Sequence, residues 1–314
     1  MQDVRHQPRV SVIIPAYDSA AYIPDAIGSV LGQTYQDFEI IVVDDGSRDG
    51  TRELVESRYP EAQFIRIEHG GAARARNVGI RNAGGEFVAF LDADDVWLPR
   101  KLEKQMTHFD RDPDVAIIFT ENNCFDDRGV IDYSHKFDKR VLMRGCVPAN
   151  ILLYSYVTTP TVIVRKKVFD DVGFFDEGLT IAEDDNLWIR ISSKYKIHLI
   201  EEILVSVRRN HGSLTSDIVA VIRGVEKNIE LLRDKYKCFD ESMQPIINKK
   251  YSILHNNMGY YHFTRNDFRT ARIEYAKSIR LDPGNMNSYR YLFLSFFPTA
   301  LLDAVKRCKR KFSR

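Results

Sequence analysis

Three carboxylates stand within four residues of the sequence FLDADDVWLP, directly after an apolar run. Asp92, Asp94 and Asp95 follow residues 87–91, and like charges this close repel one another unless a cation lies among them. Alternating carboxylates are hard oxygen ligands that suit Mg²⁺ or Mn²⁺, which bind through one or two carboxylates plus the phosphates of a substrate. The alternative is a helix cap, since acidic side chains favour the N-terminus of a helix such as the one predicted to begin at Pro99.

A second acidic turn follows the apolar run at 38–43. Asp44 and Asp45 stand at its end, and Gly46-Ser47 comes next. An aspartate in this place can accept hydrogen bonds from a base N–H or from a ribose hydroxyl. The Asp-Gly-Ser sequence is also strong turn chemistry, so this motif taken alone predicts no more than a turn.

A third acidic group, Glu183-Asp184-Asp185, begins a segment at 184–194 in which apolar residues have helical spacing. Taken alone, the group is an acidic helix start, which the helix dipole favours. Trp188 follows Asp184 by four residues and lies on the same helix face. Its ring is either a core side chain or a platform for a sugar.

The elements that must position these acids alternate between strand and helix. Apolar, β-branched runs predict strands, with apolar residues at helical spacing between them, at 10–15, 38–43, 64–67 and 86–91. Such alternation predicts βαβ units and a parallel sheet. Ligands of open α/β sheets bind outside the carboxyl ends of the strands. We therefore expect a site where these strands end, at 15–18, 44–47, 68–71 and 92–95.

The rest of the chain is expected to differ from this first half. Residues 114–210 mix strands and a helix, and everything from Ser216 onward has a helical pattern. We therefore predict one domain at 1–215 and a helical region at 216–314. Within the latter, residues 257–283 resemble one tetratricopeptide-like hairpin. A single unit cannot bury its own face, so a helical appendage is the preferred interpretation.

Composition limits the classes of function. Of 314 residues, 44% are hydrophobic and 28% are charged, which is ordinary for a globular protein. The formal net charge of +1 argues against a partner such as nucleic acid. The four cysteines form no CxxC pair and are expected to be reduced thiols in a cytoplasmic protein. We expect neither a signal peptide nor a membrane-spanning segment, because the N-terminus is polar and no apolar run approaches ~20 residues.

Two common nucleotide-binding folds are excluded by missing motifs. VIIPAYDS stands where a dinucleotide fold needs GxGxxG after its first strand, and the P-loop signature GxxxxGK[ST] is absent from the sequence. A nucleotide would therefore be bound by side chains more than by a glycine cradle.

Four motifs, taken in order, resemble the family 2 glycosyltransferases, which are inverting, nucleotide-sugar-dependent enzymes with a GT-A fold. They are VSVIIPAYDSAAYIPDAIGSVLGQTY, IIVVDDGSRDGT, GGAARARNVGIRNAGGEFVAFLDADD and AEDDNLWIRI. The resemblance covers residues 9–212, about two thirds of the chain. It implies an α/β fold of the GT-A type, with a Rossmann-like, mostly parallel sheet flanked by helices and an all-helical C-terminal extension.

The resemblance implies a nucleotide-sugar site at the strand ends. Pro15, Ala16 and Tyr17 would line the nucleobase pocket through backbone and ring contacts. Asp44, or alternatively Asp45, would contact the base.

Residues after the glycine pair Gly70-Gly71 are implied to lie near the nucleotide. They are Arg74, Arg76 and Asn77, and the planar fork of arginine suits a diphosphate. The alternative is a solvated helix face, which we expect for Arg81. His211 would lie in a loop that closes over the diphosphate.

The acidic loop is implied to hold the metal ion. Asp94 would bind Mg²⁺ or Mn²⁺, and Asp92 would lie beside it, near the ribose or a metal-bound water. Ala93, which lies between them in the sequence, would contact the nucleotide sugar. Asp95 would support the site or contact the sugar.

The third acidic group is implied to supply the base. Asp184 matches the residue that takes the proton of the acceptor hydroxyl. Glu183 would contact the acceptor or support the base, and Trp188 would contact the acceptor if its ring is a sugar platform. The reaction would be one in-line displacement, with the metal acting as a Lewis acid on the diphosphate.

The implied function is transfer of a sugar from a nucleoside-diphosphate sugar to a hydroxyl of a saccharide or lipid-linked saccharide. UDP is favoured by family habit, and synthesis of bacterial surface polysaccharide or glycolipid is the expected setting. One alternative is a nucleotidyltransferase, although PAYDSAAY lacks the glycine-rich basic signature of that class. The other is a catalytically silent sugar-nucleotide-binding module on the same fold.

The C-terminus has a pattern of its own. Six of the last nine residues, 306–314, are basic and none is acidic, and apolar and aromatic residues crowd 292–302. This combination suits an anionic membrane surface, which would place the protein peripherally at the inner face of the cell membrane. A solvated tail after a core helix is the alternative.

Overall fold

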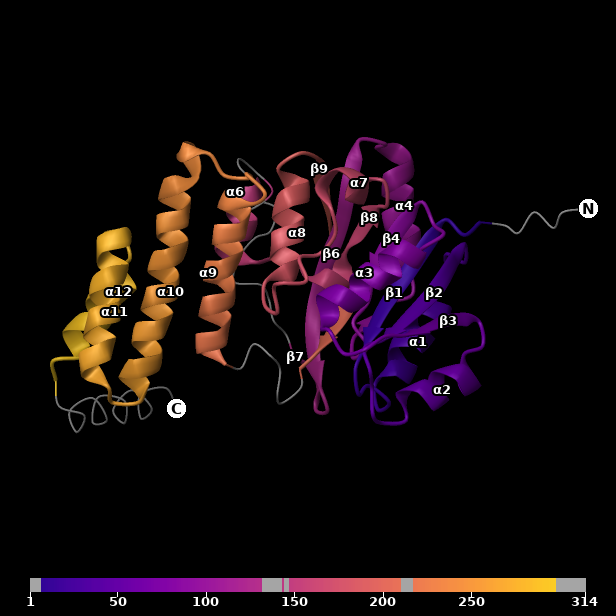
Figure 1. Ribbon diagram of the computed structural model, residues 1–314, viewed down its shortest axis with the longest axis horizontal. Coiled ribbons are helices and arrows are strands. Elements are labelled where there is room, and N and C mark those ends of the chain that lie inside the picture. Colours follow the sequence, from indigo (N-terminus) through magenta and orange to yellow (C-terminus); the bar gives the residue numbers. More distant parts are fainter. Residues whose placement is uncertain (1–6, 132–142, 144–146, 210–216, 298–314) are drawn as a thin grey trace, which may run out of the picture. The chain divides into compact units, whose positions relative to one another are not determined.

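The computed structural model describes residues 7–131, 143, 147–209 and 217–297. The chain divides into two compact units, Met1–Ser213 and Leu214–Arg314. In the described residues, all strands belong to the first unit, and the second contains only helices and their connections (Figure 1).

One sheet forms the centre of the first unit, with the strand order β3-β2-β1-β4-β8-β6-β9-β5 and with β7 paired to β6 (Figure 1). Its strands are β1 (Val10–Ala16), β2 (Phe38–Asp44), β3 (Ala62–Arg66), β4 (Phe87–Phe90), β5 (Val96–Trp97), β6 (Val115–Asp126), β7 (Gly129–Ile131), β8 (Ile163–Arg165) and β9 (Lys196–Arg208). The neighbours β3, β2, β1 and β4 are parallel, and β6 pairs with β9 in parallel, whereas β8 and β5 run opposite to the strands beside them. The predicted α/β architecture is therefore confirmed.

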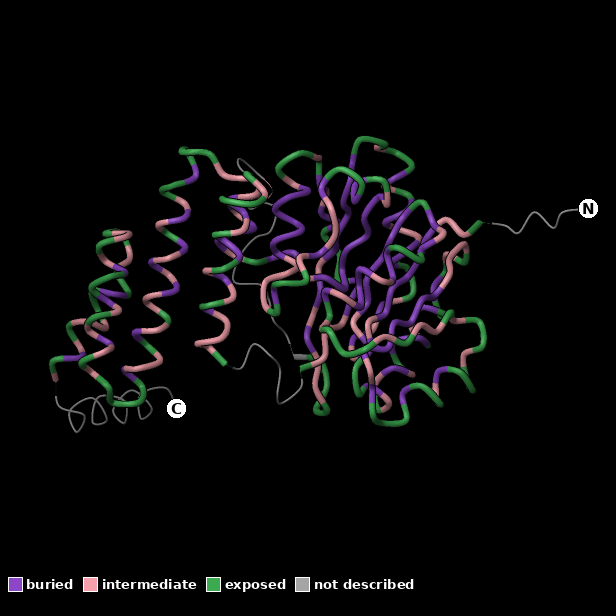
Figure 2. Tube along the Cα trace, in the orientation of Figure 1, coloured by how far each residue is buried: buried purple, intermediate pink, exposed green. Residues whose placement is uncertain are grey.

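Helices cover both faces of this sheet. They are α1 (Ile23–Leu31), α2 (Thr51–Arg58), α3 (Ala72–Asn82), α4 (Lys101–Arg111), α6 (Val147–Tyr154), α7 (Val168–Val172) and α8 (Glu183–Ser192), with a 3₁₀ turn η1 (Thr159–Thr161). α1 and α4 share a buried cluster with Val12 and Ile14 of β1, whereas Ile13 between them faces α3. Alternate residues of a strand point to opposite faces, so α3 lies on the face opposite α1 and α4. Burial on both faces (Figure 2) explains the continuous apolar runs of the strands.

α3 lies so close to β1 that there is no room for a side chain at Gly79. A Cβ placed there would be 2.4 Å from Cγ2 of Ile13, and Ile13 is itself fully buried. At the start of the helix, Gly71 has a φ of 91°, a conformation that glycine adopts without steric cost. The start of the helix and its distance from the strand are thus fixed. The positions of Arg76 and Asn77 within the helix are fixed with them.

The segment after the three aspartates differs from the prediction. The sequence predicts a helix from Pro99, but α4 begins at Lys101. The preceding residues first pair with β9, since β5 joins that strand and the N–H of Leu98 donates to the carbonyl of Leu204 at 2.9 Å. A two-residue edge strand leaves no periodic signal in a sequence. The sequence analysis also does not predict β7, α6 or α7 individually.

The second unit is built from helices. They are α9 (Ile218–Asp234), the turn η3 (Glu241–Met243), α10 (Gln244–Thr264), α11 (Phe268–Leu281) and α12 (Met286–Leu294). α10 and α11 form a hairpin in which a Cβ at Gly259 would be 2.6 Å from the ring of Tyr275. The side chain of Asp267 caps α11 by accepting from the N–H of Thr270 at 3.1 Å. None of the described helices is long and apolar enough to cross a membrane.

The close approach of α3 predicts that Gly79→Ala destabilises the first unit. The added methyl group would overlap fully buried Ile13, and overpacking of this kind typically costs about 1–3 kcal/mol. The measurement is the free energy of unfolding in urea. Gly28→Ala is the matched control, because nothing lies within 4 Å of its Cβ and alanine favours a helix more than glycine does. Equal stability of the two variants would contradict the packing described here.

Candidate active site

The carboxyl ends of three neighbouring strands bring the predicted residues together. β1 lies between β2 and β4, and Ala16 pairs with Asp44 across the first of these ladders. Because the three strands are parallel, their following residues meet at the same edge of the sheet. The segments that meet there are 15–17, 44–45 and 92–95.

Tyr17 and Asp44 form the two sides of the predicted base site. The Tyr17 ring is 47% exposed and lies against the ring of His69, with centroids 4.4 Å apart and an interplanar angle of 32°. Asp44 is fully buried, and its Oδ1 accepts from the N–H of Ser47 at 3.1 Å. Its Oδ2 has no hydrogen-bond partner among the described residues, and Nη1 of Arg66 lies 3.6 Å away. Oδ2 is thus a buried acceptor oxygen that is ion-paired with Arg66.

Asp45 has a different task from Asp44. Its two oxygens accept from the N–H groups of Gly70 and Gly71, each at 2.8 Å, and Oδ2 lies 2.9 Å from Nδ1 of His69. The carboxylate therefore fixes the loop that leads into α3 and places His69 beside Tyr17. Of the two predicted base-contacting residues, Asp44 is the one that keeps an oxygen without a hydrogen bond in the described structure.

Arg76 lies among the acidic groups as a buried cation. Its Nη2 donates to Oδ1 of Asp92 at 2.8 Å and its Nη1 to Oε1 of Glu183 at 3.0 Å, while the guanidinium lies 5.5 Å from the ring centroid of Phe175. Burial lowers the pKa of Arg76, but Asp92 and Glu183 raise it by more, so that the pKa stands above its ordinary value. The arginine thus joins the acidic loop after β4 to the acidic start of α8.

Asp95 fastens the acidic loop to the sheet. Its buried Oδ1 accepts from the N–H of Arg208 at 2.8 Å, and Nε of Arg208 donates to the carbonyl of Asp94 at 3.0 Å. Burial, together with the charges of Asp92 and Asp94, raises the pKa of Asp95 well above its ordinary value.

The donor chemistry of the loop fits a hard cation. Carboxylate oxygens are the ligands that Mg²⁺ and Mn²⁺ prefer, and the loop carries three of these groups within four residues. Within the described stretches of the chain, no three His, Cys, Asp or Glu side chains converge as a ready-made cage. The loop fits an ion that takes its remaining ligands from elsewhere.

Asp184 is held from two sides at the start of α8. Its Oδ1 accepts from the N–H of Asp185 at 2.8 Å, and its Oδ2 accepts from Oγ1 of Thr159 at 3.0 Å. Next to it, burial and then the charge of Asp184 raise the pKa of Glu183 to about 6, while Arg76 lowers it. The backbone enters the helix through Ala182, which has a φ of 62°.

Trp188 belongs to the core. Its exposed fraction is 0%, and its ring packs against Phe90 and Phe175 with centroids 6.0 and 5.8 Å apart. A ring without exposed surface cannot stack on an acceptor. The predicted role as a sugar platform is therefore wrong, and the alternative of a core side chain is confirmed.

Two of the residues predicted beside the nucleotide make contacts within the protein. Both N–H donors of the Asn77 amide are used, one by the carbonyl of Phe175 at 3.0 Å and one by Oε1 of Glu177 at 2.8 Å. The amide thus fastens the loop before α8 to α3 and has no N–H left for the predicted contact. Arg74 lies over Gly70, where a Cβ would be 2.4 Å from its Cδ.

Of the remaining predicted residues, the structure describes some and not others. Ala93 is buried in the acidic loop with 7% exposed. His211 and the basic segment 306–314 lie outside the described residues.

Among the contacts of the site that the sequence analysis misses are His69 beside Tyr17 and Thr159 beside Asp184. His69 stands immediately before Gly70, so its place in the predicted loop is a signal that could have drawn attention to it. Thr159 carries no motif, and only the fold brings it to Asp184.

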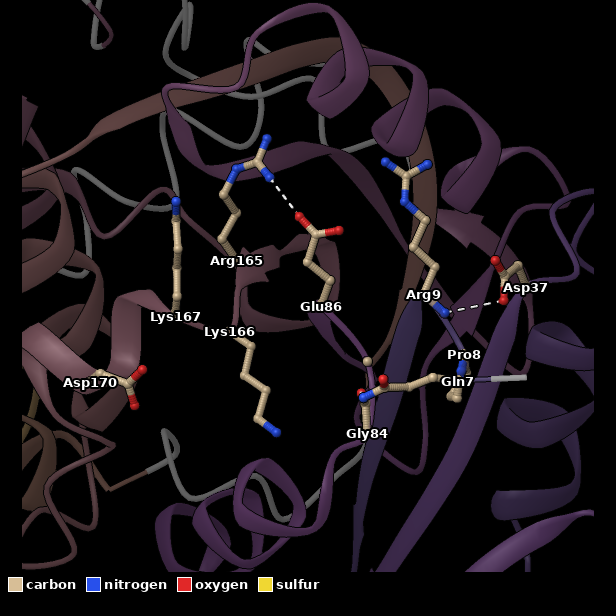
Figure 3. Close-up of a pocket in the computed structure, with 11 residues that line it drawn as sticks. Gln7, Pro8, Arg9, Asp37, Gly84, Glu86, Arg165, Lys166, Lys167 and Asp170 are labelled. Atoms are coloured by element: carbon tan, nitrogen blue, oxygen red, sulfur yellow. Dashed lines mark hydrogen bonds and ion pairs between the residues drawn. The ribbon is translucent and has the colours of Figure 1, made fainter. Parts of the chain in front are cut away.

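A separate cavity of about 630 Å³ lies at the other end of the sheet, where β1, β2 and β4 begin (Figure 3). Basic residues among its walls are already bound: Arg165 to Glu86 at 3.1 Å and Lys166 to the carbonyl of Ala83. The cavity lies at the amino ends of the strands and contains none of the predicted site residues.

Comparison with known proteins agrees with the motifs. The profile described as "Glycosyl transferase family 2" matches residues 11–173. An uncharacterized glycosyltransferase of Rickettsia typhi is 34% identical over 221 residues, covering 69% of each chain. The putative teichuronic acid biosynthesis glycosyltransferase TuaG of Bacillus subtilis is 45% identical over 104 residues, which are 32% of this chain and 41% of TuaG.

Solved structures share the fold. The mannosyltransferase PcManGT of Pyrobaculum calidifontis, in complex with GDP-Man and Mn²⁺, has a TM-score of 0.61 at 19% identity and covers 98% of this chain and 84% of its own. Residues 1–349 of TarS from S. aureus, in complex with UDP-GlcNAc, give a TM-score of 0.57 at 20% identity, covering 90% and 89%. At these identities the likeness is one of fold, and it agrees with the GT-A class. With a family profile that spans more than half of its length, the chain belongs to glycosyl transferase family 2.

Proposed function

We propose that the protein transfers a sugar, with inversion, from a UDP-linked donor to an acceptor hydroxyl. The observation that carries this proposal is the bridge from Asp92 through Arg76 to Glu183, with distances of 2.8 and 3.0 Å. This bridge holds an acidic loop suited to a metal and a diphosphate beside Asp184, which is suited to act as a base. A donor and an acceptor could thus meet within one site.

The choice of UDP rests on Asp44. Its Oδ2 is an acceptor without a hydrogen-bond partner among the described residues, so it favours a base that offers a ring N–H. Uracil and guanine offer one, whereas the corresponding nitrogen of cytosine is an acceptor and would face the carboxylate unpaired. The Tyr17 and His69 rings offer a stacking surface for the base. TarS in complex with UDP-GlcNAc and PcManGT in complex with GDP-Man support a donor of this kind.

We assign the metal to Asp94, with Asp92 as its neighbour. Asp92 accepts a hydrogen bond from Arg76; Asp94 would be the direct ligand, and donor phosphates would complete the coordination. PcManGT in complex with Mn²⁺ supports such an ion. When bound, the ion supplies Lewis acidity to the departing diphosphate.

The chain's own residues perform the other steps. Asp184 accepts the proton of the acceptor hydroxyl as this hydroxyl attacks the anomeric carbon from the side opposite the diphosphate. Glu183, held by Arg76, lies next to the base and can contact the acceptor. Arg76 neutralises the acids that flank the reacting centre, and the hydrogen bonds of Asp184 keep it in place.

The acceptor is proposed to be a saccharide or a lipid-linked saccharide in the synthesis of surface polysaccharide or glycolipid. The name of TuaG, a putative teichuronic acid biosynthesis glycosyltransferase, supports this setting. The alternative of a nucleotidyltransferase is not supported by the family. The activity of the variants described next distinguishes an enzyme from the alternative of a silent binding module.

Asp184→Asn is expected to lower the rate of transfer from UDP-sugar about 10²–10⁴-fold, because the amide cannot take a proton, while UDP binding is retained. Asp94→Asn is expected to abolish the increase in UDP affinity that Mn²⁺ produces. Product formation and calorimetric titration measure the two effects. Asp114→Asn, an exposed aspartate outside the site, is the control. Wild-type turnover in both site variants would refute the mechanism.

The contact of Asp44 predicts a preference among nucleotides. The wild-type protein is expected to bind UDP at least roughly tenfold more tightly than CDP, the effect of one charge-assisted hydrogen bond. Asp44→Asn can turn an N–H toward cytosine. The ratio of the dissociation constant for CDP to that for UDP should therefore fall toward one. Titration calorimetry with UDP and CDP measures it. Equal affinity of the wild-type protein for both nucleotides would contradict the role of Asp44.

We further propose that the second unit contacts an anionic membrane surface. Exposed apolar side chains lie at spacings of three and four residues along and just after α12, namely Met286, Tyr289, Phe293 and Phe296, with exposed fractions of 70%, 40%, 64% and 65%. Tyr291, Leu292, Leu294 and Phe297 pack inward on the cluster around Phe263 and Tyr275. In the sequence, the apolar stripe precedes the basic segment 306–314. Such a combination favours an anionic lipid surface.

The double variant Phe293→Ser/Phe296→Ser is expected to lower binding of the full chain to phosphatidylglycerol vesicles roughly tenfold, since each ring loses apolar burial. Deletion of 306–314 should lower it further, at ~1 kcal/mol for each basic residue. Vesicle co-sedimentation measures both. Ile273→Ser, at a half-exposed position of α11 outside the stripe, is the control. Unchanged vesicle binding by both altered proteins would exclude the membrane proposal.

A further inference from the structure

A buried turn outside all four sequence motifs supports the start of α8. The turn η1 comprises Thr159, Pro160 and Thr161, and the exposed fractions of its two threonines are 3% and 0%. Oγ1 of Thr159 donates to Oδ2 of Asp184 at 3.0 Å. The same carboxylate also accepts from the adjacent N–H of Asp185, which belongs to its own helix. Thr159 therefore provides a contact from a different segment of the fold.

The turn is itself held by the element that follows the acidic loop. Nε1 of Trp97 in β5 donates to the carbonyl of Pro160 at 2.9 Å. Nε2 of Gln105 in α4 donates to the carbonyl of Thr161, also at 2.9 Å. Trp97 stands two residues after Asp95, with 2% of its surface exposed. A continuous path of buried contacts therefore leads from the acidic loop through Trp97 and the turn to Asp184.

We propose that Thr159 is a positioning residue for Asp184, and that its hydroxyl sets where the base stands relative to the donor loop. The proposal rests on the proposed function, in which Asp184 takes the acceptor proton. An ionised carboxylate has about four acceptor sites, so the hydrogen bonds from Thr159 and Asp185 fix its orientation and leave sites for the acceptor hydroxyl. The threonine touches neither donor nor acceptor in this arrangement and acts only through the aspartate.

A merely structural role for the hydroxyl makes a different prediction. If Thr159 only filled space in the turn, removing its oxygen would change stability and leave the rate per bound substrate unchanged. If it positions the base, removal lowers kcat and leaves donor binding unchanged, because the donor contacts lie on other residues. The two roles therefore separate in a comparison of kcat with KM and with the melting temperature.

The chain offers a matched control in the same turn region. Thr158 is adjacent to Thr159, and its hydroxyl donates to Oδ1 of Asn122 at 3.3 Å rather than to Asp184. Thr158→Val removes the corresponding hydroxyl oxygen from the neighbouring residue. Thr159→Val removes the hydroxyl at nearly constant volume, and Thr159→Ser retains it. Thr159→Ala is the second variant if valine prevents folding.

The experiment measures kcat and donor KM for transfer, UDP affinity by calorimetry and the melting temperature for each full-length variant. Thr159→Val is expected to lower kcat roughly tenfold, the scale of a small misplacement of a reacting group. UDP affinity should remain unchanged, Thr159→Ser should restore kcat, and Thr158→Val should turn over like the wild type. In an Asp184→Asn background, Thr159→Val should cause no further loss.

Two results overturn the proposal. One is wild-type kcat in Thr159→Val and Thr159→Ala, and the other is a loss of kcat that serine does not restore in a folded protein. If the proposed function itself is wrong, the result differs: Asp184→Asn then retains wild-type turnover. A protein in which Asp184→Asn is inactive and Thr159→Val is fully active would keep the base and lose only the role of Thr159.

Discussion

A buried guanidinium between carboxylates is the interaction on which the site depends. Arg76 contacts Asp92 on the loop after β4 and Glu183 at the start of α8, two segments that are 91 residues apart in the sequence (183 minus 92). Removing one partner from a buried ion pair typically costs about 3–5 kcal/mol, because the remaining charge is left uncompensated. The cation that joins the two acidic motifs here thus comes from a third motif.

The position of that guanidinium is set by the backbone. The carboxylate of Asp45 binds the amides of Gly70 and Gly71 at the start of α3, and Gly79 lets the same helix rest against β1. Misplacement of a reacting group by about 1 Å can cost on the order of 100-fold in rate. The glycines of this segment thus help to fix where Arg76 lies.

Residues that depend on local pattern could be predicted from the sequence, and residues that depend on tertiary contact could not. Asp44 and the acidic loop follow apolar strands, so their common edge of the sheet follows from chain order alone. Trp188 shares a helix face with Asp184, but periodicity does not tell how far the core extends along that face. Thr159 and Asp184 are 25 residues apart, and the hydrogen bond between them comes from a turn that lies in no sequence motif.

The ring pair beside Asp44 has a consequence for how tightly any base can be held. The centroids of the Tyr17 and His69 rings are 4.4 Å apart, and Asp45 binds the imidazole. Both residues keep exposed surface, 47% for Tyr17 and 62% for the His69 side chain, so a base that stacks on an outer face leaves the contact between the rings, worth about 0.5–1.5 kcal/mol, in place. In the proposed function, the second ring would therefore support a stacked base from behind without being displaced by it.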